Sequence, residues 1–239
     1  LTVTKFSDGK RYISGNRCER GAGQTKTEKK YPNLYDYKYE RAFGYTPLDE
    51  DKAKRGTIGI PRALNIYENY PLWFTFFTEL GYRVVVSGRS SHALYESGMD
   101  SIPSESVCYP AKMVHGHIKN LLDMGVKTIF YPCIPYEQTE YSDAGNHYNC
   151  PIVTSYPEVI YNNMDELRGI NFIYPFVNLD DRKSFVKQLS DAFGDIGKAE
   201  IERAADKAFA ELAAYKSDIR KKGEETLKWL EDNNEHGIV

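Results

Sequence analysis

The sequence predicts an α/β domain of Rossmann-like type, with three layers and a mainly parallel sheet. Short β-branched segments alternate with amphipathic helical segments after residue 57, a pattern typical of parallel strands joined by right-handed helical crossovers. The 239 residues are also enough to bury a sizeable core. We therefore expect an N-terminal arm over residues 1–55, the α/β domain over 56–178 and a helical extension over 179–239.

The N-terminal arm begins with two short alternating segments around Ser7-Asp8-Gly9, a sequence typical of a hairpin turn. The polar, glycine-rich stretch that follows places Cys18 in a loop. A short helix is expected over about 34–43, before the charged linker 46–56.

The α/β domain is expected to alternate strands and helices from residue 57 onward. Strands are predicted at 57–60, 83–88, 127–132 and 151–156, the last for the sequence PIVTSY. One helix carries an aromatic stripe and ends at Gly81, and another spans about 110–124 and ends at Gly125. Residues 170–177 form either a further strand or an extended exit from the domain.

Two helices are expected in the C-terminal extension, over 180–193 and over 198–234. The second would be roughly 50 Å long, longer than the domain on which it packs. Part of its apolar stripe would then meet a partner, either another copy in a homodimer or a domain of the same chain. The alternative is a pair of helices broken near Gly223, because glycine has low helix propensity.

Composition excludes several classes of function. The formal charge is −3, so nucleic-acid binding has no electrostatic basis, and no run of 18 apolar residues predicts a membrane span. Four cysteines are too few for a disulfide scaffold, which favours a cytoplasmic location. The sequence starts with Leu1 instead of Met, from which we expect a piece of a longer polypeptide.

Three cysteines are candidates for chemistry. Cys108 precedes Pro110 at the expected start of a helix, where the helix dipole favours a thiolate. Cys133 lies at the carboxyl end of the third strand, the edge where open α/β sheets bind ligands. Cys150 is expected to open the fourth strand, and Cys108 is expected at the edge opposite Cys133. With no C-x-x-C pair, either a shared metal site or separate free cysteines would account for the spacing.

Other polar residues in the same regions are weaker candidates. His115 and His117 lie two positions apart on one helix and point in nearly opposite directions, so they cannot chelate one metal ion. Arg62 follows the first strand, where an anion could dock, but no glycine-rich phosphate motif is present. The loop before Cys150 either binds a ligand or is a solvated surface loop. Its candidates are Glu137, Glu140, Asp143 and His147, with Tyr136, Tyr141 and Tyr148.

Three runs of the sequence resemble the family labelled DUF2229. They are IGIPRALNIYENYPLWFTFFTELGYRVVVSG (58–88), CYPAKMVHGHIKNLLDMGVKTIFYPC (108–133) and NCPIVTSYPEVI (149–160). The opening YISGNRCERG (12–21) resembles the stretch that precedes this domain in the proteins of that family. The family occurs in very large proteins described as acyl-CoA dehydratase activase-related, or CoA-substrate-specific enzyme activases. The resemblance implies ATPase domains of the BadF/BcrA type in the same chain and an acyl-CoA substrate.

The same resemblance implies a cofactor. The domain is similar to the cluster-bearing subunits of 2-hydroxyacyl-CoA dehydratases, whose cysteines hold [4Fe-4S] or double-cubane clusters. It therefore implies an iron–sulfur electron-transfer module, with Cys108 and Cys133 as first ligands, Cys150 as third and Cys18 as fourth. The parent would be an ATP-dependent activase or a dehydratase-like enzyme, and the piece alone would be inactive. The alternatives are a cofactor-free scaffold that docks ATPase domains to a catalytic partner, and a CoA or acyl-CoA site that uses Arg62 and the tyrosine-rich loop 134–149.

Overall fold

The computed structural model describes residues 2–15 and 31–238, which fall into two compact units, residues 1–33 and 34–239. In the first unit, β1 (Thr2–Lys5) and β2 (Arg11–Ser14) form the predicted antiparallel hairpin. Gly9 at the turn has φ +85°, a conformation that glycine adopts without strain. Cys18 lies outside the described residues.

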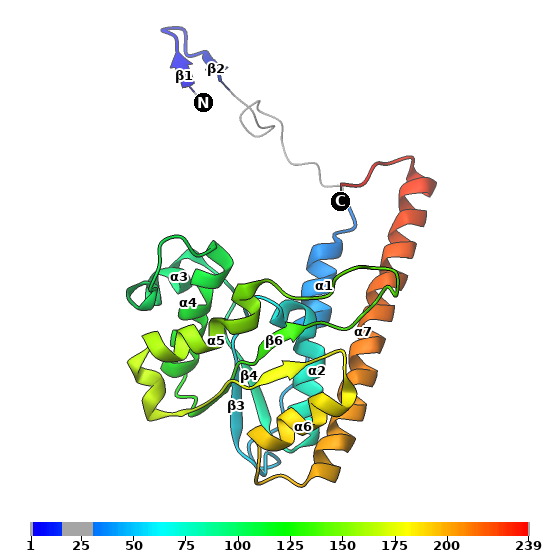
Figure 1. The fold of residues 1–239 in the computed structure, drawn as a ribbon. Helices are drawn as coiled ribbons and strands as arrows, with labels where there is room; N and C mark the ends of the chain where they lie inside the picture. Colours follow the sequence, from blue (N-terminus) through cyan, green and yellow to red (C-terminus); the bar gives the residue numbers. More distant parts are fainter. Residues whose placement is uncertain (1, 16–30, 239) are drawn as a thin grey trace. The chain divides into compact units, whose positions relative to one another are not determined.

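The second unit holds the α/β domain together with the helices on either side of it (Figure 1). Its α-helices are α1 (Leu34–Phe43), α2 (Ile66–Glu79), α3 (His92–Ser97), α4 (Tyr109–Asp123), α5 (Pro151–Asn163), α6 (Arg182–Ala192) and α7 (Lys198–Asn233). Its strands are β3 (Thr57–Ile60), β4 (Arg83–Val86), β5 (Thr128–Phe130), β6 (Cys133–Tyr136), β7 (Asn171–Ile173) and β8 (Phe176–Asn178), and its 3-10 helices are η1 (Met99–Ser101) and η2 (Asp165–Gly169).

All the strand pairs of the second unit are parallel, in the order β4-β3-β5-β7, with β6 paired to β8. The dipeptide Tyr131-Pro132 separates β5 from β6, and Tyr174-Pro175 separates β7 from β8. Each strand is interrupted there because proline has no N–H to donate to the ladder. Phe130 pairs with Ile173, and three residues later Cys133 pairs with Phe176. The register therefore continues across both dipeptides.

Helices cover both faces of this sheet, which confirms the predicted three-layer α/β class. On one face, Phe130 of β5 packs on Trp73 and Phe77 of α2, with ring centroids 4.9 and 4.7 Å away. The other face is covered by α4 and α5. Gly59 of β3 faces α4, where an added Cβ would lie 2.9 Å from the Val126 side chain, so glycine permits the close approach.

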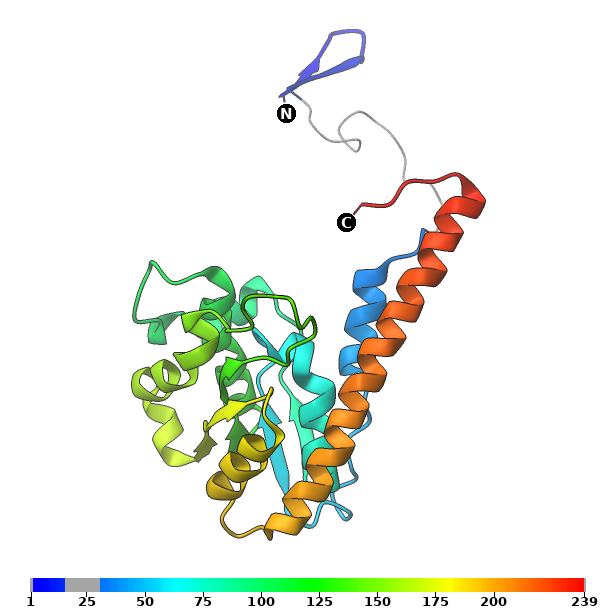
Figure 2. The ribbon, with the colours of Figure 1, turned by 45° about the vertical axis from the view of Figure 1, so that its right-hand side comes forward.

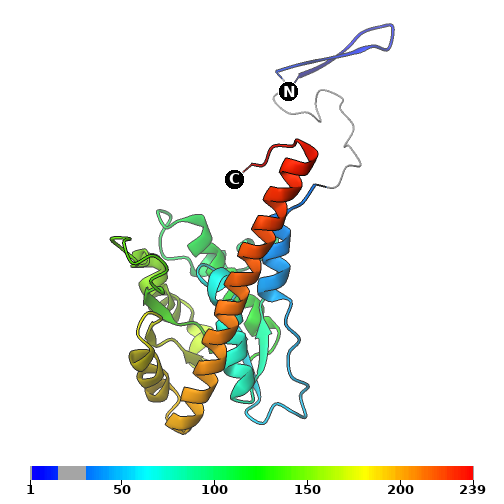
Figure 3. The same cartoon turned by 90° about the vertical axis from the view of Figure 1, so that its right-hand side faces the viewer.

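The long helix α7 is continuous through Gly223, so the alternative of two helices does not occur. Its buried residues all lie between Ile201 and Tyr215, and this half packs along α2 (Figures 2 and 3). Residues 216–233 contain no buried side chain. The apolar face of α7 is therefore buried over its first half, and only Ile219 of the described residues beyond Tyr215 is among the partly buried apolar side chains packed against the core.

One predicted element is wrong: PIVTSY is the start of α5 and not a fourth strand. The β-branched run at 152–154 suggests a strand, but Pro151 suits the first turn of a helix. Tyr156 and Ile160 then recur at helical spacing and are buried. The strand after β5 and β6 comes later, because residues 170–177 form β7 and β8. Among the described residues, no helix has the length and apolar character to cross a membrane.

Candidate cysteine site

Cys108 and Cys150 both lie at the carboxyl edge of the sheet, because each precedes a helix that crosses back between parallel strands. Such a helix runs antiparallel to the strands, so its first residue is at their carboxyl ends. The expectation that Cys108 lies at the edge opposite Cys133 is therefore wrong. Cys150 also does not open a strand, since it is the residue before α5. We call this edge, with Cys108, Cys133, Cys150, Tyr131 and Tyr156, the cysteine corner.

Cys108 and Cys150 have nearly the same local structure. Each is an N-cap residue, with φ/ψ of −61°/150° for Cys108 and −62°/155° for Cys150, and each is followed by a proline in the first turn. Both side chains are exposed. The positive end of a helix dipole and free backbone N–H groups favour anionic sulfur at such positions.

Cys133 differs from the other two cysteines because it is fully buried. Burial raises the pKa of its thiol to about 12, and the nearby charge of Glu158 on α5 adds to that effect. The Glu158 backbone N–H opposes it in part. In the absence of a metal ion, Cys133 is therefore a neutral thiol that packs against the middle of α5.

Backbone and side-chain hydrogen bonds tie the residue before Cys150 to the strand that Cys133 begins. The Asn149 N–H donates to the carbonyl of Pro135 at 2.9 Å, and its side-chain amide donates to the carbonyl of Ile134 at 3.0 Å. Cys150 therefore lies beside β6 even though a loop of 13 residues precedes it. The fold-back needed to bring Cys150 near Cys133 is present.

Glu137 fixes that arrangement through a set of asparagine side chains. Its carboxylate accepts hydrogen bonds from the amide of Asn149 at 2.9 Å and from the buried amide of Asn69 at 2.9 and 3.1 Å. A weaker contact comes from Asn65 at 3.4 Å. Asn65 and Asn69 belong to the first turns of α2, where Leu64 has the positive φ of 49°. Glu137 thus acts as a structural anchor of the loop and not as a free acid.

Two buried tyrosines, Tyr131 and Tyr156, lie near the cysteines of the corner. Tyr131 is 1% exposed, and its hydroxyl has no hydrogen-bond partner among the described residues. Burial raises the Tyr131 pKa well above its ordinary range, and the charges of Cys133, Tyr156 and Cys150 add to this effect. Burial likewise raises the pKa of Tyr156 to about 12, with a contribution from Cys108. The two phenols thus connect the surroundings of all three thiols.

His115 links the cysteine corner to η1. The Ser101 hydroxyl donates to the carbonyl of Gly98, so it accepts from Nδ1–H of His115 at 2.7 Å. Nε2 is then the acceptor, and the Tyr156 hydroxyl donates to it at 3.0 Å. Burial lowers the pKa of His115 to about 4, which keeps the ring neutral.

His117 points to another part of the molecule, as its two-residue spacing from His115 predicts. Its ring nitrogens are hydrogen-bonded to the hydroxyls of Ser87 at 2.8 Å and Ser90 at 3.0 Å. Burial, with the nearby charge of Arg62, lowers the His117 pKa to about 4. Arg62 itself donates to the Ser87 carbonyl and stacks over Phe43. Its guanidinium is therefore used inside the domain at the position predicted to bind an anion.

An open pocket of about 610 Å³ lies beside Arg62, between α1 and the first turns of α2. Its walls are largely aromatic, and its cations Lys38 and Arg89 form ion pairs with Glu68 and Glu40. The pocket is lined by Tyr35, Asp36, Lys38, Tyr39, Ala42, Phe43, Tyr67, Glu68, Arg89 and Ser90. None of these lining residues is a cysteine or lies next to one in the sequence.

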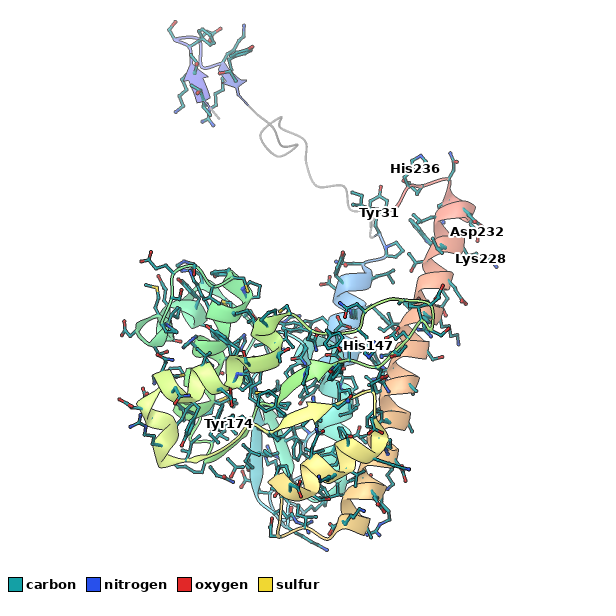
Figure 4. All side chains as sticks on the ribbon, in the orientation of Figure 1. Tyr31, His147, Tyr174, Lys228, Asp232 and His236 are labelled. Carbon is teal, nitrogen blue, oxygen red and sulfur yellow. The ribbon has the colours of Figure 1, made fainter. Side chains whose placement is uncertain are left out.

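The remaining candidates of the 137–149 loop attach this loop to neighbouring elements. Glu140 forms ion pairs with Lys216 and Arg220 of α7. His147, labelled in Figure 4, lies 3.4 Å from a carboxylate oxygen of Asp180. These contacts explain the polar character of the loop without a ligand.

No three histidine, cysteine, aspartate or glutamate side chains of the described residues are already arranged around a metal position. The donors that the corner offers are nevertheless of the kind that binds iron and sulfide. They are two exposed thiols at helix N-termini, a third thiol behind them and a buried hydroxyl without a partner. Sequence reasoning selected the cysteines and, as a weaker candidate, Glu137, but missed Tyr131 and Tyr156 as parts of the site. The Tyr-Pro dipeptides on two strands were the signal for the first of these.

The fold and the edge site together define a doubly wound α/β domain with its candidate site at the carboxyl ends of the strands. Over residues 57–239 the chain matches the family described as the CoA enzyme activase uncharacterised domain, DUF2229. It belongs to that family. No curated protein and no solved structure matches the chain.

Proposed function

We propose that this domain is an iron–sulfur electron-transfer module of an ATP-driven CoA-enzyme system, with a cluster of the [4Fe-4S] type held at the cysteine corner. The single observation that carries the proposal is the equivalence of Cys108 and Cys150. Two exposed cysteines with matching N-cap geometry on neighbouring helices are a specific arrangement, and a purely structural role would not require it.

The residues of the corner suit the binding of a cluster. Cys108 and Cys150 would supply thiolates that their helix N-termini stabilise, and Cys133 would be the third ligand. Cys18 stays the proposed fourth. When bound, such a cluster supplies one-electron chemistry at low potential. The chain's own contribution is to orient the thiols through Asn149 and Glu137 and to shield one side of the site with α5.

The test is anaerobic reconstitution of the chain with iron and sulfide, followed by iron analysis and absorbance near 400 nm. Cys108→Ala and Cys150→Ala are each expected to abolish most of the cluster, because each removes one of the ligands in the proposal. Cys133→Ala is expected to lower iron content as well. If all the variants keep the iron content of the parent chain, the proposal is wrong.

A second function is favoured by the exposed end of α7. Residues 216–233 carry no buried side chain, and Leu227 there is 63% exposed. Figure 4 shows Lys228 and Asp232 on this part of the helix, beyond the sheet and the helices that cover it. A scaffold that docks ATPase domains, or a second copy of the chain, would use this surface. Partner binding that survives replacement of all four cysteines would favour the scaffold over the electron-transfer module.

A further inference from the structure

The buried hydroxyl of Tyr131 is the feature of the cysteine corner that the protein itself does not explain. Burying a hydroxyl without a hydrogen bond costs free energy. Tyr131 nevertheless lies 1% exposed with no partner among the described residues for its OH. A phenylalanine would fill the same space without that cost, so the hydroxyl calls for a role other than packing.

The position of Tyr131 directly after β5, where its N–H still donates to the Ile173 carbonyl of the neighbouring strand, directs it toward the thiols. Phe130 faces the aromatic layer of α2, and successive side chains of a strand alternate between faces. Tyr131 therefore faces the opposite layer, which α4 and α5 form, and Cys133 two residues later is on the same side. The anchor of Asn149 on β6 brings Cys150 to that side as well.

The second phenol of the corner cannot serve as the donor. The Tyr156 hydroxyl already gives its proton to His115 Nε2, because the other side of that ring is fixed by Ser101. Its oxygen can only accept a further hydrogen bond. Of the two phenols, Tyr131 is thus the one whose proton is uncommitted.

We propose that the Tyr131 hydroxyl is the hydrogen-bond donor of the cysteine corner and donates to a sulfur of the bound cluster. This inference rests on the proposed function. A donor at the sulfur stabilises the more negative, reduced state and so raises the reduction potential. Tyr131 is in this sense a positioning and tuning residue and not a metal ligand.

The experiment compares Tyr131→Phe with Tyr215→Phe in the full 239-residue chain after anaerobic reconstitution. Tyr215 on α7 is a matched control, because it is 2% exposed and its hydroxyl also has no hydrogen-bond partner among the described residues. The readouts are iron content, the midpoint potential from an EPR-monitored titration, and proton couplings that disappear in D₂O. Each variant is also checked for cooperative unfolding before loading.

Three results are expected together. Iron content stays equal in the parent chain and both variants, the midpoint potential of Tyr131→Phe alone shifts to more negative values, and Tyr131→Phe alone loses an exchangeable proton coupling. Equal potentials and couplings in all three proteins would overturn the inference while leaving the cluster assignment intact. Loss of iron from a folded Tyr131→Phe variant would also overturn it, in favour of a role in holding the thiols. Absence of iron from the parent chain would overturn the proposed function and this inference with it.

Discussion

On one face of the sheet, α2 brings Trp73 and Phe77 against Phe130 of β5, and Phe185 of α6 stacks on Trp73, in a layer of aromatic rings. On the other face, the residue directly after the strand is Tyr131, which lies near Cys133, Cys150 and Tyr156. The two layers share a strand and are equally dry, since Phe130 is 0% and Tyr131 1% exposed. Burial alone therefore does not distinguish a core from a site.

The two faces differ in the free energy of burying their side chains. Aromatic carbon gains free energy on leaving water, and edge-to-face pairs such as Phe77–Phe130 add to it. Polar groups on the α4 side lose their hydrogen bonds to water, and this cost in free energy is offset only where the protein supplies hydrogen bonds instead. The Tyr131 hydroxyl receives none from the described residues. We infer that the aromatic face stabilises the domain and that the α4 and α5 face carries its chemistry.

The largest expected effect is the loss of an aromatic side chain from the first face. Phe130→Ala is expected to lower the free energy of unfolding by about 3–5 kcal/mol, because it removes a ring that touches both Trp73 and Phe77 and leaves a cavity. Urea denaturation would measure the change. Phe130→Leu is the control and should cost less than about 1.5 kcal/mol. A loss below 1 kcal/mol for alanine, by the scale of such changes, would contradict the assignment of stability to this face.

Acid is expected to lower stability through the two buried histidines of α4. His115 and His117 have folded-state pKa values of about 4, against 6.5 in an unfolded chain. Well above pH 6.5 the two imidazoles are neutral in both the folded and the unfolded chain, so they add no pH dependence to stability. As the pH falls from 6.5 toward 4, the unfolded chain binds protons that the folded one does not, so stability decreases. At pH 5 the loss is up to about 2 kcal/mol per histidine.

Urea midpoints at pH 7.5 and pH 5 would measure this dependence. The double variant His115→Gln and His117→Gln should be less stable at pH 7.5 but should lose much of the additional sensitivity to acid. Equal slopes in the double variant and the parent chain would show that other groups, and not the buried imidazoles, carry the acid response.

The anchor of the loop before Cys150 is expected to give an intermediate effect. Glu137→Ala removes the carboxylate that holds Asn69, which is 2% exposed, and should cost about 1–3 kcal/mol. Cys150 should also react faster with a thiol reagent, because Asn149 loses one of its anchors. Glu140→Ala on the same loop is the control, since its ion pairs are partly exposed and worth less than about 1 kcal/mol. Equal effects of the two substitutions would show that Glu137 does not anchor the loop before Cys150.

The difference between the two faces also explains what the sequence could predict. The strands at 57–60 and 83–86 and the helices α2 and α4 follow from apolar runs and periodicity and from Gly81 and Gly125 after the helices, which are local signals. The start of α5 was mistaken for a strand, since Ile152 and Val153 favour strands while Pro151 and the later apolar positions favour a helix.

The chemical face resists prediction for a different reason. The edge of Cys108 depends on the direction of α4 relative to the sheet, which requires the topology as well as the motif. The state of Tyr131 depends on α5, which is formed by residues 20 or more positions away. No local pattern tells a buried tyrosine with a bonded hydroxyl from one without.

The smallest expected effect is a gain in stability, and it tests the comparison most directly. In the metal-free chain, Tyr131→Phe and Tyr215→Phe each remove a buried hydroxyl that has no hydrogen-bond partner among the described residues. Each should raise the free energy of unfolding by about 1 kcal/mol, because the desolvation cost of that hydroxyl disappears and the ring packing stays. Thermal and urea unfolding would measure both. A gain at both sites, joined to a change of potential at Tyr131 only, would mean that the α4 and α5 face gives up stability for its chemistry. A loss of stability at Tyr131 would instead mean that its hydroxyl already has a structural use, and the contrast between the two faces would fail at its central residue.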